Sequence, residues 1–121
     1  MNTRRKPKLK NFPSNLPRLS NSCLEKLVEE AIIDAYNESE QVSGFYTMLE
    51  DNLKLPFETE LLGVAVTVES VDMTEDEQIV AICGRAGKKQ EIPILSLPLP
   101  SPPPAGWEWI AAYRHWRRGF E

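Results

Sequence analysis

The 121-residue sequence contains few of the residues from which metal and catalytic sites are most often built. It has two cysteines and one histidine. Cys23 and Cys83 are far apart, so the C-x-x-C pair of a zinc ribbon or a thioredoxin motif is absent. His115 is accompanied by no G-x-S-x-G, P-loop or G-x-G-x-x-G motif. These absences argue against the common enzyme classes, and we expect a protein that is not an enzyme.

Long apolar runs are also lacking. No run approaches the roughly 18 residues that a membrane span requires, and no secretory signal pattern opens the chain. Both cysteines stand beside apolar residues, which is typical of reduced thiols that pack as small hydrophobes. We therefore expect a cytoplasmic protein that does not insert into a membrane.

The net charge of −4 conceals an uneven distribution along the chain. Residues 1–20 carry six Lys or Arg and no acid, whereas residues 21–80 carry fifteen acids and two lysines, a net charge of −13. Residues 81–121 carry six basic and three acidic residues, a net charge of +3. Such an acidic centre indicates a solvated face, neutralisation by the chain's own basic ends, a basic partner or bound cations.

Apolar periodicity divides the chain into an arm and one domain. The basic, proline-containing residues 1–21 show no periodic apolar pattern, and we expect a disordered arm before a single domain over residues 22–121. A capping box that begins at Ser22 predicts a helix over about 23–36. A second apolar stripe from Val42 to Leu53 predicts another helix that ends before Pro56. The short link between them predicts an antiparallel helical hairpin.

Beyond residue 60 the pattern predicts strands over 62–69, 78–84 and 89–97, with a tight turn at 85–88. A bent three-strand meander of this length is typical of a small SH3-like barrel. The proline-rich run over 97–104 predicts a polyproline II connector, and an aromatic stripe from Trp109 to Phe120 predicts a C-terminal helix. The expected fold class is α+β: a helical hairpin packed on a small antiparallel SH3-like barrel or three-strand meander, followed by the aromatic helix.

Acidic side chains gather around the link between the two predicted helices, which we call the elbow (residues 34–41). Glu30, Asp34 and Glu38 have the spacing of one helical face, where each like-charge pair costs about 0.2–0.5 kcal/mol. The second helix carries Glu50 and Asp51 in its last turn, where the helix dipole disfavours negative charge. The packing of the two helices decides whether these two acids join the elbow or form a separate site. Oxygen donors without His or Cys are the ligands of Ca²⁺ or Mg²⁺. A solvated acidic face is the alternative interpretation.

Two further charged segments have weaker signals. Residues 72–77 begin like an EF-hand loop, but Glu77 stands where that loop needs glycine, which favours a solvated turn. The basic arm has the charge for phosphate contacts, yet only Phe12 is available for base stacking, so we do not expect nucleic acid as a partner.

A specific motif runs through the helical half. It consists of Asp34-Ala-Tyr36-Asn37-Glu38-Ser-Glu40-Gln41, then Gly44-Phe45-Tyr46, Leu49-Glu50-Asp51 and Pro56-Phe57. This motif resembles the small acidic bacterial, cyanobacterial-type calcium-binding proteins of the CcbP family, which are not EF-hand proteins. The resemblance covers about residues 24–120, with Phe45 where tryptophan is common. It implies helices packed against a small barrel and a Ca²⁺ site with candidate ligands Asp34, Asn37, Glu38, Glu40, Glu50 and Asp51.

The expected function is therefore calcium-ion binding by a monomeric cytosolic buffer or sensor with clustered carboxylates at the elbow. The alternative is a non-enzymatic SH3-like interaction module whose basic arm binds a protein or nucleic acid.

Overall fold

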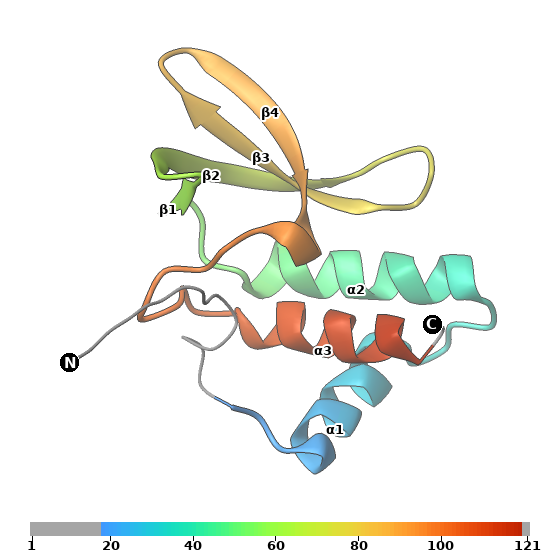
Figure 1. Ribbon diagram of the computed structural model, residues 1–121. Coiled ribbons are helices and arrows are strands. Elements are labelled where there is room, and N and C mark those ends of the chain that lie inside the picture. Colours follow the sequence, from blue (N-terminus) through green and yellow to red (C-terminus); the bar gives the residue numbers. More distant parts are fainter. Residues whose placement is uncertain (1–17, 120–121) are drawn as a thin grey trace.

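The computed structural model describes residues 18–119, which form an α+β fold (Figure 1). In chain order the elements are α1 (Asn21–Ala31), α2 (Glu38–Asn52), β1 (Phe57–Leu61), β2 (Val64–Met73), β3 (Ile79–Arg85), β4 (Lys88–Pro93), the 3₁₀ turn η2 (Ile94–Ser96) and α3 (Glu108–Arg118). Residues 1–17 of the predicted disordered arm lie outside the described residues. None of the described helices has both the length and the apolar character that a membrane crossing requires.

The strands form an open antiparallel sheet in the order β1-β2-β3-β4. The predicted SH3-like barrel is therefore wrong, because no pairing joins β1 to β4 among residues 18–119. The sequence predicted a meander of three strands, whereas the sheet contains four. Leu62 and Gly63 do not begin a strand but form the β1–β2 turn, with φ angles of 52° and 78°. The predicted turn at 85–88 is confirmed, with Ala86 and Gly87 both at positive φ.

The first helix is shorter than predicted. It ends at Ala31, and Asp34 follows with a φ of 65° in the left-handed region, which a continuing right-handed helix excludes. Its N-terminal cap is Ser20, whose Oγ accepts a hydrogen bond from the Cys23 N–H at 3.1 Å, rather than the predicted Ser22. The predicted second helix and C-terminal helix are present as α2 and α3.

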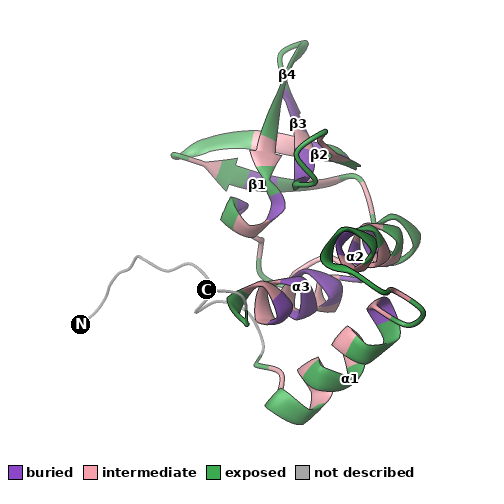
Figure 2. Ribbon diagram, turned by 90° about the vertical axis from the view of Figure 1, so that its right-hand side faces the viewer, coloured by how far each residue is buried: buried purple, intermediate pink, exposed green. Residues whose placement is uncertain are grey.

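The elements stack in three layers (Figures 1 and 2). The sheet lies above α2 and α3, which run side by side, and α1 lies on the side of these helices remote from the sheet. The predicted simple helical hairpin is replaced by a three-helix arrangement, because α1 contacts α3 as well as α2. Consequently α3 contacts both of the helices that the acidic link joins.

The core lies between the sheet and the paired helices (Figure 2). Phe45 of α2 is completely buried, and its ring centroid is 5.4 Å from that of Tyr113 and 5.3 Å from that of Trp116. The predicted aromatic stripe of the last helix therefore packs on the core, while Phe120 lies outside the described residues. The proline-rich run is packed against the domain, since the Thr59 hydroxyl donates to the Pro98 carbonyl at 2.6 Å.

Candidate metal centre

The residues predicted as ligands lie at opposite ends of α2. Asp34, Asn37, Glu38 and Glu40 stand at or before its first turn, whereas Glu50 and Asp51 stand in its last turn. A helix rises about 1.5 Å per residue, so Glu38 and Glu50 are separated by roughly 18 Å along the axis. The helix therefore holds two groups of acids and not one cluster.

Two of the elbow residues cap the start of α2. The Asn37 Oδ1 accepts a hydrogen bond from the Glu40 N–H at 2.8 Å, and the Glu40 Oε1 accepts one from the Tyr36 N–H at 2.6 Å. This arrangement resembles a capping box, with the Glu40 side chain bound to the N–H of Tyr36, one residue before the cap residue Asn37. The cap fixes the local backbone at the start of α2.

The two remaining elbow acids stand on different segments. Glu38 is the first residue of α2, and its Oε2 lies 3.7 Å from the Arg117 Nη1 of α3. Asp34 is exposed in the turn after α1. The prediction that Glu30, Asp34 and Glu38 share one helical face is wrong, because α1 ends before Asp34 and Glu38 belongs to the next helix.

A further acid reaches the elbow from the sheet. The Ser39 Oγ donates to the Glu77 Oε2 at 2.5 Å, and Glu77 has a φ of 64° in the turn between β2 and β3. The acidic turn, which the sequence indicated as a separate solvated segment, thus touches the first turn of α2 (Figure 1). The sequence does not predict the contact of Glu77 with the elbow, because nothing in the local pattern indicates that segments so far apart in the chain meet.

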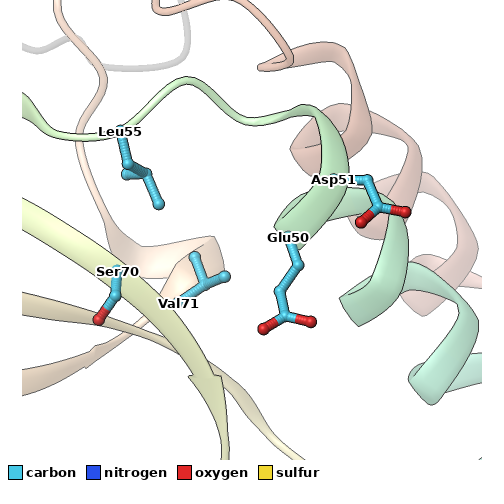
Figure 3. A pocket seen from close by; sticks show the side chains of 5 residues that line it. All are labelled: Glu50, Asp51, Leu55, Ser70 and Val71. Atoms are coloured by element: carbon cyan, nitrogen blue, oxygen red, sulfur yellow. The ribbon is translucent and has the colours of Figure 1, made fainter.

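The other group borders a shallow depression between α2 and β2 (Figure 3). Its volume is about 410 Å³, and it is lined by Glu50, Asp51, Leu55, Ser70 and Val71. The Tyr46 hydroxyl donates to the Glu50 Oε2 at 3.0 Å and lies 3.5 Å from the Val71 carbonyl oxygen. Burial raises the pKa of Tyr46, and the carboxylates of Glu50 and Asp72 raise it further. Asp72 of β2 is therefore one of the charges that act on Tyr46.

Helix electrostatics differ between the two groups. The last turn of α2 holds no basic residue, so the charges of Glu50 and Asp51 meet the negative end of the helix dipole without a cationic side chain in that turn. The first turn holds Glu38 and Glu40, which the positive end of the same dipole favours.

The donors fit calcium by their chemistry. All of them are carboxylate or amide oxygens, which suit a hard divalent cation better than a transition metal. Within residues 18–119 no group of three or more His, Cys, Asp or Glu side chains is gathered as a preformed metal cage. Exposed side chains such as those of Asp34 and Glu38 must therefore turn toward an ion in order to bind it together.

Comparison with known proteins identifies the family. No curated protein and no solved structure matches the chain. The family model Calci_bind_CcbP, described as calcium binding, matches residues 25–117, a span that contains both acidic groups and Glu77. This is a calcium-binding family and not an enzyme family. The chain thus belongs to the CcbP-type family of calcium-binding proteins.

Proposed function

We propose that this protein is a cytosolic calcium buffer or sensor that binds Ca²⁺ through the carboxylates of the elbow. One observation carries the proposal: an acid from the sheet reaches the elbow, because the Ser39 Oγ donates to the Glu77 Oε2 beside Glu38 in the first turn of α2. Asp34 precedes these residues in the exposed turn after α1. Calcium takes six to eight oxygens in flexible geometry, and water supplies those that exposed carboxylates do not.

The position of the elbow favours reversible binding. Its carboxylates are exposed, so an ion there keeps part of its hydration shell, and the positive end of the α2 dipole opposes a bound cation. The cap formed by Asn37 and Glu40 keeps the backbone in place whether or not an ion is present. Moderate affinity with little rearrangement is what a buffer needs.

The acids at the other end of α2 support a second binding locus. Glu50 and Asp51 have no basic neighbour in their helical turn, and Asp72 adds charge from β2. Because the helix dipole favours a cation at this end, an ion bound here relieves repulsion that the protein otherwise carries. The elbow acid Glu38 faces Arg117, whereas Glu50 and Asp51 face no basic residue in their turn. The two binding loci therefore need separate tests.

Calorimetric titration with Ca²⁺, with Mg²⁺ as the comparison ion, tests the proposal. Two charge-matched variants probe the two ends of α2: Asp34→Asn with Glu38→Gln, and Glu50→Gln with Asp51→Asn. We expect each pair to weaken the binding of at least one ion by about tenfold. The control is Glu58→Gln with Glu60→Gln, which removes the same charge from exposed positions of β1 and should change affinity less than twofold.

Thermal or urea unfolding gives an independent measure. A ligand at a hundredfold excess over its dissociation constant stabilises the folded state by about 2.7 kcal/mol. The absence of both heat and stabilisation at millimolar Ca²⁺ would refute calcium binding by this chain. Equal weakening in all three variant pairs would instead show that general charge, and not the elbow, attracts the ion.

A further inference from the structure

We propose that Arg117 is a built-in competitor of calcium for Glu38, so that an ion at the elbow displaces the Arg117 guanidinium from the Glu38 carboxylate. This inference rests on the proposed function, because it concerns the regulation of the same site. Its basis is the ion pair that joins these two residues across the α2–α3 contact.

The Arg117–Glu38 ion pair is close enough for Arg117 to compete with calcium, and weak enough for calcium to replace Arg117. The Arg117 Nη1 lies 3.7 Å from the Glu38 Oε2, longer than the 2.7–2.9 Å of a strong charge-assisted hydrogen bond. The side chains of Arg117 and Glu38 are 40% and 57% exposed. A cation that takes Glu38 therefore leaves no buried charge behind, because the guanidinium turns to solvent.

Arg117 also has an alternative partner beside it. Its guanidinium carbon lies 5.9 Å from the ring centroid of Trp116, within the range of a cation–π contact. The indole Nε1–H of Trp116 in turn donates to the Gln41 Oε1 at 2.8 Å, and Gln41 lies one turn after Glu38 on α2. When calcium replaces Arg117 at Glu38, the freed guanidinium thus changes the surroundings of the Trp116 indole, which contacts α2 through Gln41.

The neighbouring Arg118 provides a matched control. It is exposed, it carries the same charge in the same turn of α3, and it forms no ion pair among the described residues. Replacing either arginine by glutamine changes the net charge equally. Only Arg117→Gln removes the group that faces Glu38.

Calcium titration of the full chain, the R117Q variant and the R118Q variant at about 0.15 M salt tests the proposal. Exposed ion pairs contribute little, so we expect R117Q to tighten calcium binding by roughly two- to fivefold. R118Q should change it by much less, because screening weakens the more distant charge. In an E38Q background, R117Q should have no further effect on affinity.

The indole NMR signal of Trp116 supplies a second readout. Calcium should shift this signal in the unmodified chain, and calcium-free R117Q should already be displaced toward the calcium-bound position. The proposed role of Arg117 would be overturned if R117Q and R118Q tightened calcium binding equally. It would also be overturned if R117Q still tightened calcium binding in the E38Q background. Absence of calcium heat in the unmodified chain would overturn the elbow site and this inference together.

Discussion

At its first turn α2 carries Glu38 and Glu40, and at its last turn it carries Glu50 and Asp51. The same carboxylate chemistry therefore meets opposite ends of one helix dipole. The first turn adds internal partners, because Glu40 caps the backbone and Glu38 faces Arg117. In the last turn the phenol of Tyr46 donates to Glu50, and no basic residue stands nearby in the turn.

The two ends of α2 therefore differ in how far the protein itself neutralises its carboxylates. At the elbow the protein compensates the charge itself, so a cation must exchange for partners that are already present. At the far end the charge is only partly compensated, so a cation adds a partner. A buffer that combines both loci would release ions first from the elbow, where the internal competitors lie.

The largest expected effect concerns two glycines at close backbone contacts: Gly106, which meets the end of α2, and Gly44 within α2, which meets the end of α1. A Cβ on Gly106 would lie 2.2 Å from the Asn52 carbonyl oxygen, and its φ is 89°. A Cβ on Gly44 would lie 2.1 Å from the Ala31 carbonyl oxygen, without a positive φ. We expect Gly106→Ala to lower the free energy of unfolding by about 2–5 kcal/mol, because overpacking and backbone strain add. Gly44→Ala should lower it by about 1–3 kcal/mol.

Urea unfolding followed by circular dichroism measures both changes. Gly87→Ala is the control, because its φ is 79° but no atom lies within 4 Å of the added Cβ. It should cost only the strain, about 1–2 kcal/mol. If Gly106→Ala cost no more than this control, the close backbone contact at the far end of α2 would not be a stabilising feature.

A smaller effect with opposite signs at the two ends tests the role of the dipole. Without calcium, Glu38→Gln should lower the free energy of unfolding by about 0.3–1 kcal/mol, because it removes a favourable charge at the helix start. Asp51→Asn should raise it by a similar amount, because it removes an unfavourable charge at the helix end. Urea unfolding at low and high salt provides the measurement. Changes of the same sign, or changes that salt does not reduce, would contradict this electrostatic comparison.

The sequence predicts the helices that pack on the core and is less successful at their boundaries. Val42, Phe45 and Leu49 are buried in α2, so their spacing follows the real packing face. After α1, Ile32 and Ile33 continue the apolar pattern, yet Ile33 is 72% exposed because the helix has already ended at Ala31. The strand predicted to begin at Leu62 begins later, because Leu62 is apolar but is a fully exposed turn residue. Hydrophobicity alone does not distinguish a buried residue from one in a left-handed turn.

The candidate site is predictable in its residues but not in its grouping. The motif contains Asp34, Glu38 and Glu50, but only helix length shows that the last of these is remote from the elbow. Glu77 joins the elbow through a contact with Ser39 that depends on how the sheet lies over the helices. Long-range placement of this kind comes from packing of the core, which the acids themselves do not determine.

The smallest expected effect is a shift in the titration of Tyr46, and it reports which end of α2 holds an ion. Burial, and then the neighbouring carboxylates of Glu50 and Asp72, raise the pKa of Tyr46 above the usual value of about 10. The folded state therefore retains this proton after the unfolded chain has lost it. Tyr46 thus contributes stability below pH 10 that is lost as the pH rises toward the folded-state pKa.

Calcium near Glu50 or Asp72 neutralises the charges that raise this pKa, so the pKa of Tyr46 should fall when the ion is added. Calcium at the elbow alone should change it much less, because Tyr46 lies about 12 Å along the helix axis from Glu38 and salt screens charges at that separation. Carbon-13 NMR of the tyrosine ring in carbonate-free buffers measures the titration, with Tyr46→Phe assigning the signal. Tyr113 is the internal control, since burial is the main cause of its raised pKa. A pKa of Tyr46 that does not respond to saturating calcium would restrict binding to the elbow, where the ion must compete with the protein's own partners.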